Sequence, residues 1–339
     1  MSTTTTRGAT RMAVVTGASS GIGLATTQEL ARRGFHVLAG VRTRQDAERL
    51  ASDNIEPVIV DITDEGQVAA LADRVAHDPL GRRLGAVVNN AGVALNAPVE
   101  AIPLAEWRRH FDVNFFGHVA VVQALLPALI ASGDGRLVNV SSIGGRVAFP
   151  TYGAYAASKF ALEALSDVLR REVSRLGVKV IVIEPGTIAT PMWGKGMATM
   201  DELAATMTAD QHARYGDLIA AMRKQAEGQA GSGIQPLRAA TVIADAIQSR
   251  KPRTRYLVGR DAQLLAGIAG VLSDRMVDRL VARNLGLSVR PGAPGEPTTG
   301  RSNVRATVSS AEAPSLPMTV SDTHDVPGAN QEVGGERYP

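Results

Sequence analysis

The segment Ala13-Val-Val-Thr-Gly-Ala-Ser-Ser-Gly-Ile-Gly23 decides the fold of this chain. Its first residues are apolar and mostly β-branched, which predicts a buried strand, and apolar residues at helical spacing follow over Leu24 to Arg33. Glycines at Gly17, Gly21 and Gly23 allow a tight turn and a close approach of the backbone to a ligand. Free amides at a helix start favour a pyrophosphate, so the G-x-x-x-G-x-G spacing predicts a dinucleotide site. The alternative is an ordinary turn between a strand and a helix.

The rest of the chain continues the alternation of strands and helices. Apolar runs predict strands at 36–41, 56–60, 86–89, 137–140, 179–184 and 256–258. Helical spacing predicts a helix that ends at residue 50 and helices over 65–76, 106–132, 155–176, 238–249 and 263–285. Pro127 is expected to interrupt the helix at 106–132. This alternation predicts an α/β domain, and in open parallel sheets ligands bind at the carboxyl edge of the strands.

Composition narrows the function classes. The 339 residues, 45% of them hydrophobic, suffice for one large domain with a real core. Lysine plus arginine exceeds aspartate plus glutamate by 36 − 33 = 3 charges with no basic tract, so nucleic acid is not an expected partner. The absence of cysteine excludes disulfides and thiolate catalysis, and the six histidines show no metal-ligand spacing, so no metal is expected.

The chain is expected to hold one domain at residues 11–287, with a flexible N-terminus at 1–10 and a disordered, Pro/Gly/Ser/Thr-rich tail at 288–339. Residues 1–10 are polar and do not resemble a signal peptide, which predicts a cytoplasmic location. No transmembrane segment is expected, because the apolar stretch from Leu264 to Leu272 is too short to span a bilayer.

Two serines and a tyrosine–lysine pair mark the expected catalytic stretch. Ser141 and Ser142 follow the strand at 137–140, at a carboxyl edge. Tyr155 and Lys159 are four residues apart on a predicted helix, so they project from one face. A nearby ammonium lowers the pKa of a phenol, which would make the tyrosine a usable acid/base while a serine hydroxyl bonds the same substrate oxygen. The alternative is a pair of surface neighbours.

Cofactor choice is expected to depend on the end of the second strand, Ala39-Gly-Val-Arg-Thr-Arg44. No carboxylate stands there to repel a 2′-phosphate, and Arg42 can give that phosphate a forked contact, with Ser19, Thr43 or Arg44 assisting. We therefore predict NADP over NAD, and with it carbonyl reduction. The alternative is that Arg42 is a solvated residue at the start of the next helix.

Three further features have two readings each. Asp61 is expected to bind the adenine amine, or else Asp61 or Thr63 caps the helix at 65–76. Asn114 lies among apolar residues, where a hydrogen-bonded core amide is the alternative to a site residue. The segment 191–235 is expected to form a lid over the substrate. It contains Trp193 and the methionines Met192, Met197, Met200 and Met207. These methionines form either an adaptable apolar wall of the substrate site or part of the ordinary core.

Together these motifs resemble the short-chain dehydrogenase/reductase family over residues 11–259. The residues that carry the resemblance are the glycine turn, Asn89 to Gly92, Asn114, Ser142, Tyr155, Lys159 and Pro185 to Thr190. Ser142 matches better than Ser141, because it stands thirteen residues before Tyr155, the spacing most usual in the family. The runs 145–150 and 253–260 are similar to the retinol and hydroxysteroid dehydrogenase-like branch.

The resemblance implies a single doubly wound Rossmann-type parallel sheet of about seven strands with helices on both faces. It also implies NAD(P)-dependent hydride transfer between a carbonyl and an alcohol, here on a fairly apolar substrate. A homodimer or homotetramer is implied as well, formed through the helices at 106–132 and 155–176.

The resemblance further implies residue roles. Tyr155 would exchange the proton, Ser142 would orient the substrate oxygen, Lys159 would also bond the nicotinamide ribose, and Asn114 would hold a water that relays protons. Thr190 and the Ile188 backbone would hold the carboxamide, and Asn89 the adenosine ribose region. The full set of expected cofactor contacts is Gly17, Ser19, Ser20, Gly21, Ile22, Gly23, Arg42, Asp61, Ile62, Asn89, Ala91, Gly92, Tyr155, Lys159, Pro185, Gly186, Ile188 and Thr190.

Two other functions remain open at this point. A sugar-nucleotide epimerase shares the tyrosine and lysine but usually has a different glycine spacing. A non-catalytic cofactor sensor on the same fold has no need of the intact set Asn114, Ser142, Tyr155 and Lys159. Turnover of the cofactor with a panel of ketones discriminates both.

Overall fold

A seven-stranded, all-parallel sheet forms the centre of the structure, a computed structural model that describes residues 11–230 and 233–286. The strand order is β3-β2-β1-β4-β5-β6-β7. The strands are β1 (Arg11–Val15), β2 (Phe35–Val41), β3 (Ile55–Ile59), β4 (Arg83–Asn89), β5 (Gly135–Val140), β6 (Val178–Pro185) and β7 (Arg255–Val258). The predicted doubly wound Rossmann-type fold is confirmed. The expected N-terminal segment and tail, residues 1–10 and 288–339, lie outside the described residues.

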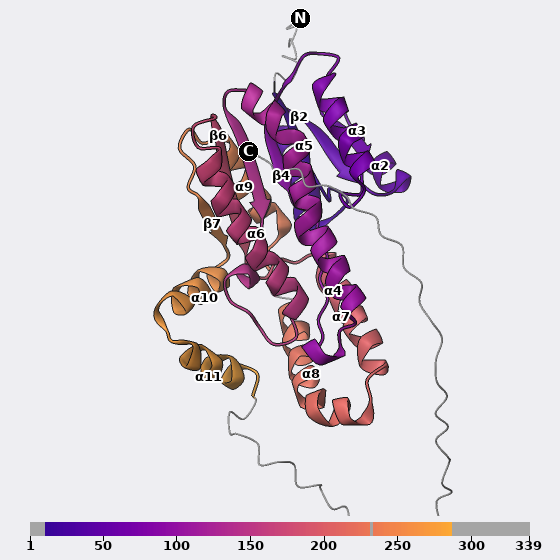
Figure 1. The fold of residues 1–339 in the computed structure, drawn as a ribbon, viewed down its shortest axis with the longest axis vertical. Helices are drawn as coiled ribbons and strands as arrows, with labels where there is room; N and C mark the ends of the chain where they lie inside the picture. Colours follow the sequence, from indigo (N-terminus) through magenta and orange to yellow (C-terminus); the bar gives the residue numbers. More distant parts are fainter. Residues whose placement is uncertain (1–10, 231–232, 287–339) are drawn as a thin grey trace, which may run out of the picture. The chain divides into compact units, whose positions relative to one another are not determined.

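Helices cover both faces of the sheet because strand side chains alternate between them. In β1, Ala13 and Val15 face one apolar cluster while Met12 and Val14 face the other. The first cluster is completed by α1 (Gly21–Arg32), α2 (Arg44–Leu50) and α9 (Pro236–Gln248), and the second by α3 (Glu65–Ala76), α5 (Gly117–Ala131) and α6 (Gly153–Glu172). Figure 1 shows α5 and α6 running across one face of the sheet.

The site is positioned where the strand order reverses. Strands β1 and β4 are hydrogen-bonded neighbours although they are not consecutive in the chain. The connections from these two strands leave in opposite directions, which opens a crevice at their carboxyl ends. The glycine turn follows β1, and Asn90-Ala-Gly92 follows β4, so both segments reach this crevice.

The long apolar helix at 106–132 differs from expectation. It is formed by α4 (Leu104–Phe111), a π-helical segment (Asp112–Phe116) and α5, and Pro127 lies inside α5 without ending it. The predicted interruption at Pro127 is therefore wrong. The irregular turn lies instead around Asn114, and π-helical turns are frequent at functional sites.

The prediction of a single helix at 263–285 is also wrong. The chain forms α10 (Arg260–Val271) and α11 (Asp274–Asn284), orange in Figure 1. Leu272 and Ser273 between them have extended backbone angles, with ψ of 146° and 155°. Ser273 followed by Asp274 is a helix-start signal, which outweighs the continuous apolar spacing.

Between β6 and α9 the chain forms α7 (Pro191–Ala205) and α8 (Ala209–Ala230), which contact each other and are salmon in Figure 1. Three short helical turns complete the described elements: Val99–Ala101, the π-helical segment given above, and Ile143–Gly145. The segment expected to form a lid is thus helical.

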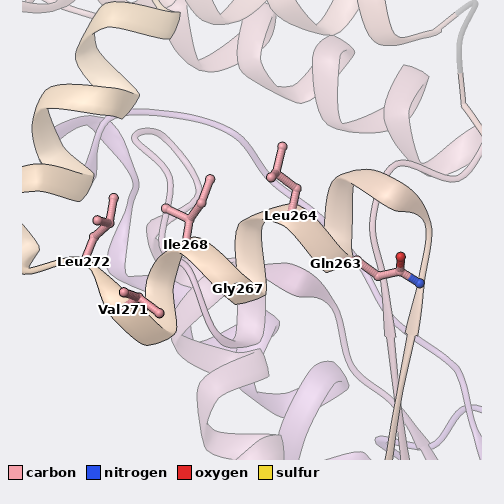
Figure 2. Close-up of a pocket in the computed structure, with 6 residues that line it drawn as sticks. All are labelled: Gln263, Leu264, Gly267, Ile268, Val271 and Leu272. Carbon is pink, nitrogen blue, oxygen red and sulfur yellow. The ribbon is translucent and has the colours of Figure 1, made fainter.

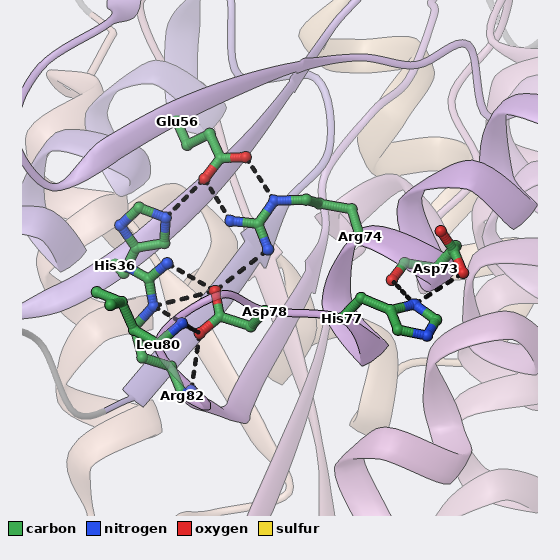
Figure 3. A network of polar contacts seen from close by, with 8 residues as sticks. All are labelled: His36, Glu56, Asp73, Arg74, His77, Asp78, Leu80 and Arg82. Atoms are coloured by element: carbon green, nitrogen blue, oxygen red, sulfur yellow. Dashed lines mark hydrogen bonds and ion pairs between the residues drawn. The ribbon is translucent and has the colours of Figure 1, made fainter.

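Charged residues tie the edge of the sheet to α3 (Figure 3). Glu56 of β3 accepts two bonds from Arg74 of α3, at 2.6 and 2.7 Å, and His36 of β2 lies 2.9 Å from the same carboxylate. Asp78 bonds both Arg74 and Arg82, and the Arg82 guanidinium holds the pKa of Asp78 far below its usual range. This network joins β2, β3, α3 and the segment before β4.

One helical stretch within the described residues, Leu104–Ala131, is long and apolar enough to cross a membrane by length and composition, with a mean hydropathy of 1.8. Its α5 part packs against α3, β4 and β5. A core helix of a folded domain passes the same length and composition test, so the stretch is weak evidence for a membrane span.

Candidate active site

A cavity of about 950 Å³ lies at the carboxyl edge of the sheet and brings together most of the expected site residues. The expected residues that line it are Gly17, Ser19, Ser20, Gly21, Ile22, Arg42, Asp61, Ile62, Ala91, Gly92, Ser142, Tyr155, Lys159, Pro185, Gly186, Ile188 and Thr190. Gly23, Asn89 and Asn114 do not line it. Tyr155 and Lys159 come from α6, and the other residues lie at the carboxyl ends of β1 to β6.

The glycine turn is packed so tightly that side chains cannot enter it. Gly17 and Gly21 have positive φ values of 65° and 57°, which L-residues rarely adopt. A β-carbon at Gly23 would lie 2.1 Å from the Gly17 carbonyl oxygen. Gly23 therefore closes the turn without touching the cavity.

The turn fits a pyrophosphate. Helix α1 begins at Gly21, three residues earlier than expected, and the side chain of its N-cap residue Ser20 caps none of its amides. These amides and the helix dipole face the same cavity wall, which suits a doubly charged diphosphate. The residues present therefore fit the dinucleotide that the sequence predicts.

Asn90 takes the place that the sequence analysis gave to Asn89. Strand β4 continues through Asn89, which pairs with Asn139 and is fully buried, donating from Nδ2 to Asn139 Oδ1 at 3.0 Å. Asn90 is the first residue past the strand and lines the cavity. Its Nδ2 donates to the carbonyls of Thr16 and Gly17 at 3.0 and 3.2 Å, so it holds the glycine turn in place. The assignment of Asn89 as a ligand contact is wrong for this reason.

Ser142 and Tyr155 face each other across Gly144. A β-carbon at Gly144 would lie 3.4 Å from both Ser142 Oγ and Tyr155 Cε1. Ser142 Oγ accepts from the Gly144 amide at 3.0 Å, which fixes the rotamer of the serine, and Ser142 also hydrogen-bonds Tyr155. Ser141 Oγ is buried without a partner among the described residues. Ser142 is thus the serine that faces the tyrosine, as the spacing predicted.

Lys159 lies under the tyrosine, with Nζ 5.9 Å from the Tyr155 ring centroid and donating to the Val140 carbonyl at 2.9 Å. Asn114 lies beside it, since a β-carbon at Gly92 would be 3.3 Å from Asn114 Oδ1 and 3.9 Å from Lys159 Nζ. Ser142 from the segment after β5, Tyr155 and Lys159 from α6, and Asn114 from the π-helical segment therefore meet at one place, as expected.

The side chain of Asn114, however, is fully engaged within the protein. Its Oδ1 accepts from the Val93 amide at 2.9 Å, and its Nδ2 donates to the Val93 carbonyl at 3.0 Å and to Ser158 Oγ at 3.1 Å. Asn114 is fully buried. Its amide therefore holds the loop after β4 against α6, which agrees with the alternative of a hydrogen-bonded core amide.

The electrostatics of the pair differ from the prediction. Desolvation raises the pKa of Tyr155, and the hydrogen bond with Ser142 opposes this rise. Lys159 is 4% exposed, and burial lowers its pKa to about 8, partly countered by Glu163. The net shift of the Tyr155 pKa is therefore upward, and Lys159 is not among its causes. A phenol with a raised pKa keeps its proton at neutral pH, which suits a proton donor.

At the far end of the cavity, Arg42 and Asp61 lie on its wall. Arg42 is exposed and makes no ion pair with the described residues. Thr43 is engaged as the N-cap of α2, where its hydroxyl bonds Asp46, and Arg44 does not line the cavity. Of the three residues expected to assist Arg42, Thr43 is thus engaged in the cap, Arg44 is off the cavity wall, and Ser19 lines the cavity.

Asp61 does not cap α3. Its Oδ1 accepts from the amide and hydroxyl of Thr63 at 3.0 and 2.7 Å. The cap of α3 is Asp64, whose Oδ1 accepts from the Gln67 amide at 3.0 Å. The interpretation of Asp61 or Thr63 as the cap is therefore wrong, and Asp61 lines the cavity instead.

The segment expected to form a lid contributes Met192, Trp193 and Met222 to the cavity wall. The indole of Trp193 donates to the Ile188 carbonyl at 2.7 Å, which ties the start of α7 to the loop after β6. In contrast, Met200 and Met207 are buried between α7 and α8. For these two methionines the ordinary core reading is correct.

A second hollow of about 390 Å³ lies on α10. Figure 2 shows Leu264, Ile268 and Leu272 along one side of this helix. Among the described residues, Gln263 is its only polar lining side chain. None of these lining residues can act as acid, base or nucleophile, so we do not regard the hollow as an active site.

The family profile described as short chain dehydrogenase matches residues 11–201, which span β1 to α7 and include the glycine turn, Ser142, Tyr155 and Lys159. This chain belongs to the short-chain dehydrogenase/reductase family.

Relatives place this dehydrogenase/reductase in the retinol and hydroxysteroid dehydrogenase-like branch. It is 33% identical to the NADPH-dependent 3-dehydrocapnine reductase of Ornithobacterium rhinotracheale, over 81% of this chain and 97% of that protein. It is 38% identical to human retinol dehydrogenase 16, over 74% and 81% of the two chains. A short chain dehydrogenase of Burkholderia cenocepacia, solved in complex with NADP, superposes with a TM-score of 0.62 at 28% identity, covering 81% of this chain and 97% of that one.

The family assignment establishes an NAD(P)-dependent oxidoreductase acting on CH–OH or carbonyl groups. Within residues 11–230 and 233–286, no group of three or more histidine, aspartate or glutamate side chains has an arrangement that could hold a metal. Sequence reasoning about this dehydrogenase/reductase missed several polar residues of the cavity wall, among them Asn90, Asn96, Tyr152 and Asp261. For Asn90 the end of β4 was the available signal; the others reach the cavity only through contacts distant in sequence.

Proposed function

We propose that this protein is an NADP(H)-dependent carbonyl reductase for a fairly apolar ketone or aldehyde, with Tyr155 as the proton donor. The observation that carries the proposal is the meeting of Ser142, Tyr155 and Lys159 in one cavity with the glycine turn. A nicotinamide cofactor, when bound, supplies the hydride. Apolar side chains that include Val147, Phe149 and Met192 line the same cavity, which favours an apolar substrate.

The chain's own residues handle the proton. Ser142, held by the Gly144 amide, orients the carbonyl oxygen toward Tyr155. Tyr155 donates its proton to that oxygen as it gains charge, and its raised pKa keeps the proton available at neutral pH. Lys159 bonds the nicotinamide ribose and stabilises the phenolate that remains. Asn114 keeps the Val93 loop and α6 in register beneath these groups.

The remaining cofactor contacts follow the cavity wall. The α1 amides bind the pyrophosphate, Asp61 bonds the adenine amine, and Ile188 and Thr190 hold the carboxamide. Because the Ile188 carbonyl already accepts from Trp193, its amide is the group we assign to the cofactor. The segment 191–235 acts as the lid, with Trp193 as its attachment.

The preference for NADP rests on Arg42, which stands on the wall at the end of β2 without an ion-pair partner among the described residues. No carboxylate of this strand end faces it. A free guanidinium in this place gives a 2′-phosphate a forked, charge-assisted contact.

Arg42→Ala is expected to weaken NADPH binding by about 10-fold or more and to leave NADH binding nearly unchanged, since a charge-assisted contact contributes about 1.5–3 kcal/mol. The measurement is kcat/KM and Kd for both cofactors. Arg44→Ala is the matched control, because this neighbouring arginine is exposed but does not line the cavity. A wild type that prefers NADH, or an Arg42→Ala variant with unchanged NADPH affinity, would overturn the assignment.

We also propose a homodimer or homotetramer formed through α5 and α6. Phe116, Phe160 and Val168 are 57%, 43% and 46% exposed on these helices and the adjoining π-helical turn. Phe160 and Val168 are eight residues apart and so share one helix face. A monomeric mass in light scattering would contradict this proposal. The cytoplasmic location predicted from the sequence stays a prediction.

A further inference from the structure

Asn96 is a polar side chain of the cavity wall that the mechanism above does not use. It lies on the loop after β4, is 5% exposed, and lines the cavity beside Tyr152. Its amide hydrogen-bonds the Tyr152 phenol, while its Oδ1 is buried and has no partner among the described residues. Twelve side-chain polar atoms are buried without a partner among the described residues, and only those of Asn96 and Ser141 belong to residues that line the cavity. An unpaired buried acceptor is costly, so a substrate group that supplies the partner of Asn96 Oδ1 is the simplest explanation.

The protein holds Asn96 and Tyr152 together by backbone contacts. The Ala97 amide donates to the Thr151 carbonyl at 2.9 Å, and Ala97 pairs with Tyr152 as an isolated parallel bridge. Thr151 is 5% exposed and has a φ of 69°. This left-handed conformation is strained for a β-branched residue. Such strain persists only where the surroundings impose it, and it is commonest at functional sites.

The pair also lies close to the reacting group. The rings of Tyr152 and Tyr155 are 6.3 Å apart between centroids, in an edge-to-face arrangement. Helix α7 covers the other side of the pair, since a β-carbon at Gly196 would be 3.5 Å from Asn96 Nδ2. The pair is thus enclosed between the lid and the catalytic helix, within reach of one small substrate.

We propose that Asn96 and Tyr152 bind a hydroxyl group of the substrate, so that the preferred substrate is an apolar hydroxy ketone whose second oxygen lies near the reacting carbonyl. The inference rests on the proposed function. A hydroxyl both donates and accepts, and here the Asn96 Oδ1 accepts while the Tyr152 phenol donates.

Two observations favour a hydroxyl over a charged group. Burial raises the pKa of Tyr152 to about 12, so the phenol remains a donor at neutral pH. Of the two arginines that line the cavity among the described residues, Arg42 is assigned to the cofactor and Arg109 is paired with Glu106 at 2.8 Å. Apolar residues such as Trp193 and Met222 fill the rest of the wall.

The test compares NADPH-dependent reduction of cyclohexanone, its 2-, 3- and 4-hydroxy derivatives, and the methyl derivatives of the same positions. The wild type is expected to prefer at least one hydroxy derivative over its methyl counterpart by about 10-fold or more in kcat/KM, because a site built for a hydroxyl rejects the analogue that lacks it. Asn96→Leu and Tyr152→Phe should each remove this preference, mainly through KM, and leave turnover of cyclohexanone within about threefold.

Folding is checked by melting temperature. Asn96→Leu should change it little, because the lost hydrogen bond to the Tyr152 phenol is offset by the removal of an unpaired buried acceptor. Equal turnover of hydroxy and methyl derivatives by the wild type, or a preference that survives in both variants, would overturn the inference alone. Absence of reduction of every ring, cyclohexanone included, would overturn the proposed function and this inference with it.

Discussion

Replacing Tyr155 by phenylalanine is expected to lower kcat for carbonyl reduction by about 10²- to 10⁴-fold, the effect of losing one positioned acid. The change removes a hydroxyl that hydrogen-bonds Ser142 and leaves the ring over Lys159 in place. NADPH binding should survive, because the glycine turn and Arg42 are untouched. Steady-state rates and the Kd for NADPH from its fluorescence are the two measurements.

The matched control for this variant is Tyr256→Phe. It makes the same chemical change at a tyrosine of β7 whose hydroxyl accepts from the Arg253 amide and does not line the cavity. Its activity should stay near wild type. If Tyr155→Phe kept the wild-type kcat, the assignment of the proton donor would be wrong.

Lys159→Met is expected to lose activity and gain stability at the same time. The substitution removes the positive charge beside the tyrosine and a cofactor contact, so both kcat and NADPH affinity should fall, with kcat/KM lower by at least about 10²-fold. It also removes a buried ammonium whose pKa is lowered from 10.5 to about 8, a cost of about 3 kcal/mol at pH 7. The substitution also leaves the buried Val140 carbonyl without its 2.9 Å hydrogen bond. This loss costs about 1–2 kcal/mol and offsets part of the gain in stability.

The stability gained by Lys159→Met is expected to depend on pH, because the pKa of Lys159 differs between the folded and the unfolded chain. Between pH 8 and 10.5 the unfolded chain binds the lysine proton more than the folded one, so wild-type stability rises with pH through this group. The destabilisation of the folded wild type by the buried Lys159 ammonium is fully present below pH 8 and disappears above pH 10.5. The melting temperature of Lys159→Met should therefore exceed that of the wild type by a few degrees at pH 7, and the advantage should vanish by about pH 10. A variant less stable at pH 7, or a difference independent of pH, would contradict this account.

Features set by local sequence could be predicted. The glycine turn and the spacing of Tyr155 and Lys159 depend on residues within a few positions of one another, and the structure places them as expected. The alternation of apolar strands with helices likewise predicted the sheet, because each apolar run had to be covered on both faces.

Features that depend on strand register or on burial could not be predicted from the sequence. Asn89 and Asn90 are neighbours, and only the point where β4 ends decides which of them faces the cavity. The role of Asn114 depends on Val93 and Ser158, which no spacing rule links to it. The pKa of Tyr155 follows from desolvation in the folded state, and a helix position alone does not show how deeply a phenol is buried.

The most direct test of the central claim follows hydride itself. NADPH deuterated at C4 of the nicotinamide ring, on each face in turn, is incubated with the protein and a ketone that it consumes, and the product is analysed by mass spectrometry. The account predicts that the alcohol carries deuterium from one of the two labelled faces and that Tyr155→Phe suppresses this transfer. A substrate converted without deuterium gain, as an epimerase would convert it, or a protein that binds NADPH and transfers no label to any carbonyl, would contradict it.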